Sequence, residues 1–236
     1  MSLLVRLICC QVILTASSAG SSLICYSIAT HFPILTTFAF RSSEVRRLLL
    51  DLYPYGDTDP LGMFRLFLKG TADVLAPSLS VVFRWLVRLG SLPACWRQAN
   101  VTLIPKSPPS SSVANYRPIY ITSVLSKVFE RPVSVHLGQF MECSFVLPTT
   151  QFAYRKDLGT CDALFCMSAL ESGEEAGIVQ IDFSAAFDRV KHQGILYKLC
   201  SMGIGGSVLS ILTQFLLNQS QHVTASPVTP INNWQN

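Results

Sequence analysis

The sequence has little charge, few histidines and no cysteines at CxxC spacing, and each shortage argues against a class of protein. Only 14% of the 236 residues are charged and 50% are hydrophobic. This excludes intrinsic disorder for most of the chain, because a disordered segment needs few apolar residues and a high net charge. The eight cysteines show no CxxC spacing and the four histidines stand alone. These patterns argue against a disulfide scaffold and against a zinc site.

Charge is almost absent from both ends of the chain. Residues 1–40 carry one formal charge, Arg6, and the segment from Leu199 to Asn236 carries none. The polar chemistry therefore lies between Arg41 and Lys198. The net charge of +4 is compatible with a nucleic-acid partner, but an ordinary, mildly basic globular protein would account for it equally well. The length suits one domain with a real core, with or without an extension.

The first 40 residues leave two interpretations open. Residues 1–20 have the order of a secretory signal peptide, with an early arginine, an apolar run and then small residues. A second apolar stretch at 22–40 is interrupted by Pro33, and two short spans make a poorer anchor than one run of about 20 apolar residues. A true targeting segment implies a secretory or membrane location. If residues 1–40 are instead an unrelated leader, the rest of the chain determines the location, which is then nuclear or cytoplasmic. The sequence leaves open whether the protein contacts a membrane.

Hydrophobic periodicity predicts an α-rich α/β protein. Helices are expected at 41–52, twice within 63–90, and at 123–142, 161–173, 192–202 and 205–219. Strands are expected at 101–104 and 177–183, the second being a continuous apolar run of the kind found in a buried central strand.

Several residues predict where these helices begin and end. Pro77 is expected near the first turn of the second helix within 63–90, and Gly90 is expected to end that helix. Thr122 is the expected cap of the next helix, which Pro132 is expected to kink or break. Thr160 is expected to cap the helix that follows it.

Asp182 is the most informative single residue, because it is a carboxylate at the end of an apolar strand. An acid in that place is costly unless it is paired or binds a metal ion. By itself, it would equally suit a cap on the following helix.

Asp182 does not stand alone, because four segments occur in a recognisable order. They are LPACWRQANVTLIPK (92–106), NYRPIYITSVLSKVFE (115–130), QFAYRKDLGTCDAL (151–164) and IDFSAAFDRVKHQGILYKL (181–199). Together they resemble the reverse transcriptases of non-LTR, LINE-like retrotransposons of the jockey and CR1 kind, over about Arg41 to Val223. The resemblance implies a partial right-hand polymerase fold containing the fingers and the first part of the palm.

The resemblance divides the chain into four regions. Residues 1–40 form an apolar leader of unknown origin, and residues 41–95 form a helical N-terminal extension. Residues 96–225 form the fingers and partial palm, and residues 226–236 form an unstructured tail.

The resemblance also assigns roles to individual residues. Lys106 and Arg117 match the cations of the fingers that hold the triphosphate of the incoming nucleotide. Asp182 matches the first catalytic aspartate, a ligand of both Mg²⁺ ions, and the carbonyl of Phe183 assists one of them. Phe187 matches the bulky residue that excludes a 2′-hydroxyl. Alternatively, Lys106 and Arg117 are solvated loop charges. The alternative for Phe187 is an aromatic side chain packed in the first turn of a helix.

Gln151 and Arg155 match a further motif that we place near the template or nucleotide groove. The implied partners are an RNA template, a DNA primer and deoxynucleoside triphosphates, and the implied cofactor is Mg²⁺ at an incomplete site. No obligate protein partner is evident from the sequence.

Some residues depart from the family pattern. The 236 residues contain neither the Tyr-Ala-Asp-Asp hairpin, which supplies the remaining metal ligands, nor the Pro-Gln-Gly motif. Asp188 is no substitute, because it lies beyond the expected strand-to-helix turn. Tyr120 stands where the family usually has serine, and Pro132 interrupts an expected helix. We also expect no endonuclease domain before Arg41 and no thumb after the palm.

Three functional hypotheses follow. The first is a reverse transcriptase truncated after the first palm motif and inactive as it stands. The second is a non-catalytic protein whose basic fingers surface still binds RNA or DNA through backbone contacts. The third is a small secreted or membrane protein defined by its first 40 residues.

Overall fold

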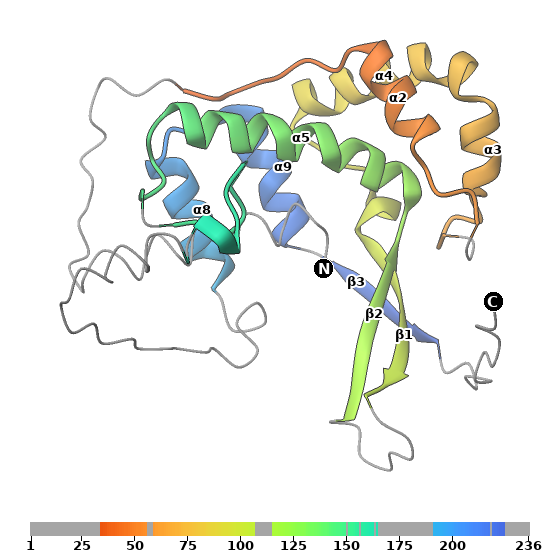
Figure 1. The fold of residues 1–236 in the computed structure, drawn as a ribbon. Helices are drawn as coiled ribbons and strands as arrows, with labels where there is room; N and C mark the ends of the chain where they lie inside the picture. The colour runs from red at the N-terminus through yellow and green to blue at the C-terminus, as the bar shows by residue number, and fades with distance from the viewer. Residues whose placement is uncertain are drawn as a thin grey trace. The chain divides into compact units, whose positions relative to one another are not determined.

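The computed structural model describes residues 34–55, 59–106, 115–149, 151–155, 157–162, 164, 191–217 and 219–224. Its elements are α2 (Ser42–Leu50), α3 (Arg65–Gly70), α4 (Ala72–Leu89), the short 3-10 helix η1 (Ala94–Arg97), β1 (Gln98–Pro105), β2 (Tyr116–Thr122), α5 (Val124–Cys143), α8 (His192–Ser201), α9 (Gly206–Leu216) and β3 (Ser220–Thr224) (Figure 1). Helices predominate and a small mixed sheet accompanies them, which confirms the α-rich α/β class.

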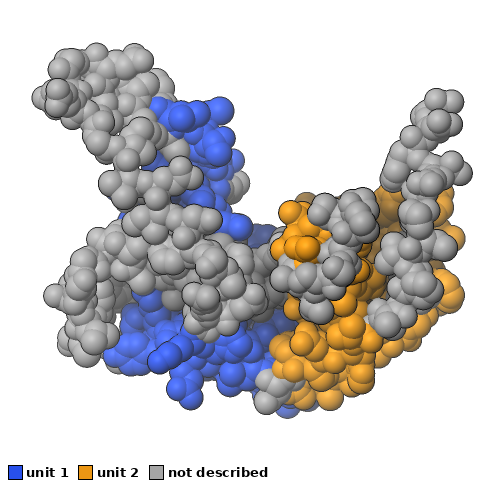
Figure 2. Space-filling view, turned by 90° about the horizontal axis from the view of Figure 1, so that it is seen from below, with its two compact units in different colours: residues 1–39, 84–91, 130–217 blue, residues 40–83, 92–129, 218–236 orange. Residues whose placement is uncertain are grey.

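The chain forms two compact units, coloured separately in Figure 2. Unit 1 contains residues 1–39, 84–91 and 130–217, and unit 2 contains residues 40–83, 92–129 and 218–236. Neither unit is a continuous stretch, because α4 and α5 each contribute residues to both.

The sheet belongs to unit 2 and has the strand order β2-β1-β3. β1 pairs antiparallel with β2 and parallel with β3. The strand expected at 101–104 lies within β1, so that prediction is confirmed. β3 was not expected, because the polar segment Ser220–Thr224 has no local strand signal and is defined by its pairing with β1.

An aromatic cluster fills the core of unit 2. Phe83 and Phe129 are fully buried, and their ring centroids lie 5.3 Å apart in an edge-to-face arrangement. Phe40 stacks on Phe129 with centroids 5.1 Å apart, and the Trp96 ring lies 5.6 Å from that of Phe129. Such pairs add stabilisation beyond the area that they bury. The cluster therefore ties α4, α5 and η1 together immediately before β1 begins.

In unit 1, the core contains the helices α8 and α9, which pack against each other. Ile195 and Leu199 of α8 and Val208 and Leu212 of α9 are all buried. The backbone of Leu35 closes the turn between these helices, since its N–H donates to the Gly203 carbonyl at 2.9 Å and its carbonyl accepts from the Gly205 N–H at 3.0 Å. Both helices lie within the ranges expected from the sequence.

α4 ends at Gly90, as expected, but begins earlier than Pro77 suggested. Gly90 has a φ of +62°, the left-handed conformation that glycine adopts readily at the end of a helix. Pro77 lies inside α4, beyond its first turn, because the helix extends back to Ala72. Asp73 in that first turn favours the earlier start, since its negative charge lies at the positive end of the helix dipole.

α5 corrects two expectations. Thr122 is the last residue of β2 and not the helix cap, and α5 begins at Val124. The expected break at Pro132 does not occur, because α5 continues through it to Cys143. Phe129 and Val133, on either side of the proline, are both completely buried. Their burial outweighs the single backbone hydrogen bond that proline removes.

The strand expected at 177–183 and most of the helix expected at 161–173 lie outside the described residues, as do 1–33 and the tail. Within the described ranges, no helix combines the length and the apolar composition needed to cross a bilayer.

Candidate functional site

The β1–β2 hairpin brings Lys106 and Arg117 to one face. In the antiparallel register, Arg117 pairs with Ile104. Lys106 follows directly after β1, and its N–H donates to the Asn115 carbonyl at 2.7 Å, which continues the ladder by one pair. Side chains alternate between the faces of a strand, so Lys106 lies on the same face as Ile104 and hence as Arg117. Such diagonal neighbours are about 7–8 Å apart at the backbone.

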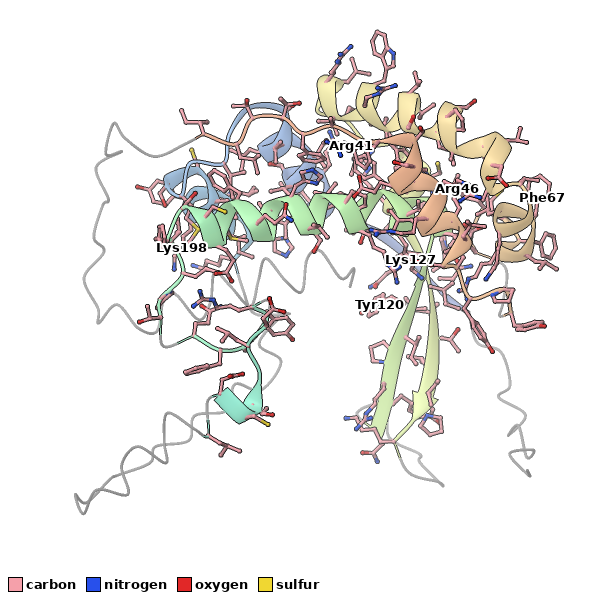
Figure 3. The ribbon with its side chains drawn as sticks, turned by 45° about the horizontal axis from the view of Figure 1, so that its top comes forward. Arg41, Arg46, Phe67, Tyr120, Lys127 and Lys198 are labelled. Carbon is pink, nitrogen blue, oxygen red and sulfur yellow. The ribbon has the colours of Figure 1, made fainter. Side chains whose placement is uncertain are left out.

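The two cations are exposed on this face. Tyr120, which stands where the family usually has serine, is not among their neighbours. Both Lys106 and Arg117 are exposed to solvent. Tyr120, labelled in Figure 3, pairs with Val101, so the alternation places it on the opposite face of the hairpin. The substitution at this position therefore leaves the Lys106 and Arg117 face unchanged.

The hairpin lies within a long stretch that has no acidic residue. From Val74 to Phe129 the chain contains no aspartate or glutamate and six basic residues: Arg84, Arg88, Arg97, Lys106, Arg117 and Lys127. Because the whole chain has a net charge of +4, the remaining residues together have a net charge of −2. Cations without neighbouring acids attract polyanions wherever they share a surface. A count of charges along the sequence could have found this stretch, although the motif search did not.

A buried carboxylate anchors the base of this hairpin. The Asp59 side chain is 4% exposed, and its Oδ2 accepts a hydrogen bond from the Val124 N–H at 2.9 Å. Its Oδ1 accepts from the N–H groups of Leu61 and Met63 at 3.0 and 2.8 Å. Asp59 thus performs the capping that was expected of Thr122. The cap was missed because it comes from a turn 65 residues earlier in the chain.

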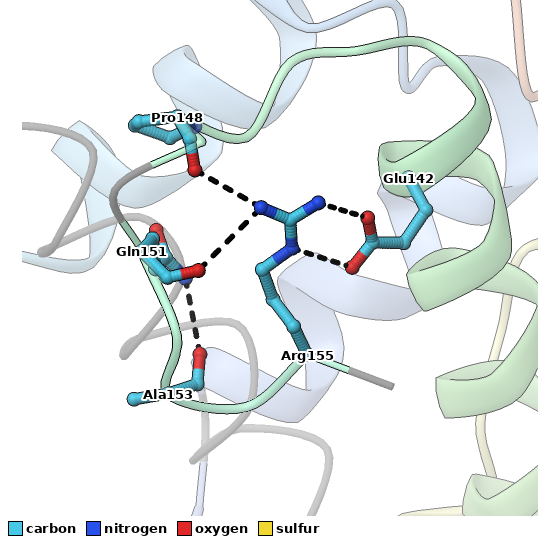
Figure 4. A network of polar contacts seen from close by, with 5 residues as sticks. All are labelled: Glu142, Pro148, Gln151, Ala153 and Arg155. Carbon is cyan, nitrogen blue, oxygen red and sulfur yellow. Dashed lines mark hydrogen bonds and ion pairs between the residues drawn. The ribbon is translucent and has the colours of Figure 1, made fainter. Parts of the chain in front are cut away.

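Arg155 is held in a network within unit 1 (Figure 4). Its guanidinium donates to both Glu142 carboxylate oxygens, at 2.9 and 2.6 Å, and also to the carbonyls of Pro148 and Gln151, at 3.1 and 3.5 Å. The hydrogen bonds to Glu142 raise the pKa of Arg155, so its guanidinium stays positively charged. These contacts fasten the turn at 148–155 to the end of α5.

Gln151 belongs to this turn and is buried. Its side chain is 6% exposed, and its amide nitrogen donates to the Ala153 carbonyl at 3.3 Å. The side-chain carbonyl oxygen is buried and accepts no hydrogen bond in the described part of the chain. A role of Gln151 or Arg155 in a template or nucleotide groove stays a prediction, because the contacts seen here bind the turn to the protein itself.

Burial perturbs one further cation. Lys198, labelled in Figure 3, is a half-buried residue of α8. Loss of hydration lowers the pKa of its ammonium group, because burial disfavours the charged form.

Asp182, Phe183 and Phe187 lie outside the described residues. Within the described ranges, no group of three or more histidine, cysteine, aspartate or glutamate side chains is placed to hold a metal ion.

A family model decides the assignment of the chain. The model described as reverse transcriptase (RNA-dependent DNA polymerase) matches residues 104–234, which is more than half of the sequence. The chain belongs to the reverse transcriptase family. The match begins at Ile104, near the end of β1, and includes Lys106 and the whole of β2 with Arg117.

Relatives place this reverse transcriptase with non-LTR, LINE-like retrotransposons. The chain is 33% identical over 127 residues to the "Probable RNA-directed DNA polymerase from transposon X-element" of Drosophila melanogaster, covering 51% of this chain and 14% of that protein. It is 29% identical over 163 residues to the RNA-directed DNA polymerase from mobile element jockey of the same species, covering 65% and 18%. It is 28% identical over 143 residues to the Pol polyprotein from the type-1 retrotransposable element R2 of Popillia japonica, covering 58% and 20%.

The chain thus spans about a fifth or less of the length of these relatives. The family model and these relatives establish the family and the class of retrotransposon.

Proposed function

We propose that this part of the reverse transcriptase binds the triphosphate of an incoming deoxynucleotide through Lys106 and Arg117. The reaction served is template-directed nucleotidyl transfer on an RNA template and a DNA primer. The observation that carries the proposal is the β1–β2 register, which supports a common exposed face for the two cations.

The two side chains suit a triphosphate in different ways. The planar guanidinium of Arg117 can donate two parallel hydrogen bonds to phosphate oxygens, whereas the Lys106 ammonium acts as a mobile point charge. The absence of acids between Val74 and Phe129 supports the proposal, because no negative charge close in the sequence repels a triphosphate from this segment. Asp59 holds the first turn of α5 beside the end of β2, and so gives the hairpin a fixed base.

The remaining site residues extend the proposal by resemblance. Asp182 and the carbonyl of Phe183 would be the residues that hold Mg²⁺, which in this family compensates the charge that develops during transfer. Phe187 would exclude a 2′-hydroxyl. Gln151 and Arg155 would line or support the template side of the groove.

We further propose that a polypeptide of only these 236 residues does not extend a primer. Its sequence contains Asp182 but no Tyr-Ala-Asp-Asp, so it lacks the carboxylates with which the family completes its two-metal site. Mg²⁺ gives up its bound waters reluctantly and needs several oxygen ligands in fixed places.

A second candidate function is non-catalytic binding of nucleic acid. The acid-free stretch favours it, since four of its six cations belong to unit 2 and have no acid between them in the sequence: Arg97, Lys106, Arg117 and Lys127. Such cations attract phosphate without a metal. This function is compatible with the first, because both depend on the same basic segment.

Triphosphate binding tests the first proposal directly. We would titrate the full chain with a fluorescently labelled deoxynucleoside triphosphate and follow anisotropy. We expect Arg117→Gln and Lys106→Gln each to weaken binding about tenfold or more, because each loses a charge-assisted contact. Arg41→Gln, which removes an exposed cation elsewhere in unit 2, is the matched control and should bind like the original chain.

Two results would contradict the proposal. One is a chain that is folded by circular dichroism but binds no triphosphate. The other is equal affinity in the two hairpin variants and the control.

A further inference from the structure

The last two turns of α4 expose an unusual face. Trp85 is 56% exposed and Leu89 is 65% exposed, while Arg84 and Arg88 are also exposed. The opposite side of the same turns is fully packed, because Phe83 and Val87 are buried. Burial of that side fixes the orientation of the helix, and so holds the indole and both guanidinium groups toward solvent. α4 is labelled in Figure 1.

The two arginines have no partner in the described part of the chain. Neither guanidinium forms an ion pair or a hydrogen bond with a described residue, and neither has an acid near it in sequence. They stand four residues apart, which makes them neighbours on the helix surface. Two like charges at this spacing destabilise an isolated helix. An anionic ligand would relieve that repulsion.

An exposed indole beside two guanidinium groups suits a ligand that combines negative charge with flat aromatic groups. Single-stranded nucleic acid has both, since its phosphates pair with arginine and its bases stack on aromatic side chains regardless of sequence. An acidic protein surface would satisfy the arginines and could cover Trp85. It would not, however, present a flat base beside every charge, as a single strand does, to stack on the exposed indole.

We propose that Arg84, Trp85 and Arg88 form a contact site for single-stranded RNA. The two guanidinium groups bind neighbouring phosphates of one strand, and a base stacks on the Trp85 indole. RNA is chosen as the ligand because of the proposed function, whereas the location of the site rests on α4 alone. The site consists of residues of unit 1, and the Lys106 and Arg117 hairpin belongs to unit 2.

The test uses the full chain and a labelled single-stranded oligouridine, with affinity measured by anisotropy over a range of salt concentrations. For Arg84→Gln/Arg88→Gln we expect the slope of log affinity against log salt to become shallower by about 1.4, since each phosphate contact on a single strand contributes about 0.7. For Trp85→Ala we expect affinity to fall about fivefold or more with the slope unchanged, because a stacked base is lost and a phosphate contact is not.

Matched controls separate the site from general charge and apolar surface. Arg41→Gln/Arg47→Gln removes two exposed arginines at the start of α2 and within it. Val74→Ala trims an apolar side chain of α4 that is 77% exposed. We expect the first control to change the salt slope by less than about a third of the 0.7 that one phosphate contact contributes. We expect the second control to leave the affinity unchanged. All the substituted side chains are exposed, so the variants should retain the fold, which circular dichroism verifies.

The outcomes distinguish this inference from the proposed function. Equal changes in the α4 variants and the controls, or no RNA binding by the original chain, would overturn the inference. Loss of RNA affinity in the α4 variants supports it even if Lys106→Gln and Arg117→Gln leave triphosphate binding intact, a result that would refute only the proposed function. Self-association that depends on Trp85, without a change in RNA affinity, would show that the face binds protein and would overturn the inference.

Discussion

The Arg155 guanidinium makes four hydrogen bonds within the protein, two of them to the Glu142 carboxylate. The side chains of Arg155 and Glu142 are only 18% and 30% exposed, so solvent screens the pair less than it screens a surface ion pair. A cation that the motif pattern associates with a nucleic-acid groove therefore has a clear structural task, which is to hold the turn at 148–155 against α5.

Arg155→Lys tests this task. Lysine keeps the positive charge but cannot reproduce the paired bonds to a carboxylate together with the two carbonyl contacts. We expect the free energy of unfolding to fall by about 1–3 kcal/mol, measured by urea denaturation. Arg47→Lys, on the exposed surface of α2, should change it by less than about 0.5 kcal/mol. An Arg155→Lys chain as stable as the original would show that the network contributes nothing.

Gly90 offers a second test at the scale of one residue. Its φ is +62°, and an added Cβ would lie 3.0 Å from the Ser210 Cβ and 3.3 Å from the Ser207 Cα. We expect Gly90→Ala to lower the free energy of unfolding by about 1–3 kcal/mol, because backbone strain and this contact add together. The Gln214 side chain, which donates to the Gly90 carbonyl at 3.0 Å, would be displaced as well.

Gly70→Ala is the control for that substitution. Gly70 is the last residue of α3, its φ is not positive, and nothing lies within 4 Å of an added Cβ. Alanine should leave the midpoint of urea denaturation unchanged or raise it slightly, because it lowers the entropy of the unfolded chain. Equal effects of the two substitutions would contradict the close approach of Gly90 to α9.

At the scale of secondary-structure elements, the start of α5 depends on Asp59. The carboxylate satisfies a backbone N–H at the helix N-terminus, where no carbonyl within the helix is available. Its other oxygen accepts two N–H groups of its own turn. One side chain therefore links the turn at 59–63 to the junction between β2 and α5.

Asp59→Asn should separate these contacts. Asparagine has one carbonyl oxygen, which can accept either from Val124 or from the turn at 59–63. Its –NH₂ group then faces N–H donors at the other position. We expect unfolding free energy to fall by about 1.5–3 kcal/mol and hydrogen exchange at the Val124 amide to accelerate. Asp73→Asn, which alters the exposed ion pair with Arg46, should have an effect below about 1 kcal/mol. Unchanged exchange at Val124 in Asp59→Asn would refute the anchor.

At the scale of the whole molecule, we expect the purified 236-residue polypeptide not to extend a DNA primer on an RNA template with Mg²⁺ and deoxynucleotides. One matched aspartate cannot compensate the negative charge that develops during phosphoryl transfer. The measurement is primer extension resolved on a gel. An active chain whose extension disappears in Asp182→Ala would contradict the prediction, since a second polypeptide or another carboxylate would then complete the site. Extension that Asp182→Ala does not affect would indicate a contaminating polymerase.

The amino-acid sequence predicts the elements whose signal is local. The spacing of apolar residues predicted α4, α8 and α9, a β-branched run predicted β1, and ordered motifs predicted the reverse transcriptase family. These predictions succeed because a helix or a strand forms when neighbouring residues present one apolar face. The common face of Lys106 and Arg117 could not be read in the same way, because it depends on the register between two strands.

The features that join distant residues depend on the folded structure. β3 exists because a polar segment pairs with β1, and α5 begins where Asp59 caps it. α5 passes through Pro132 because residues on either side are buried, and Arg155 is engaged because Glu142 lies opposite it. In each case the free energy comes from a partner far along the chain or from burial in a core, and neither leaves a periodic pattern in the nearby sequence.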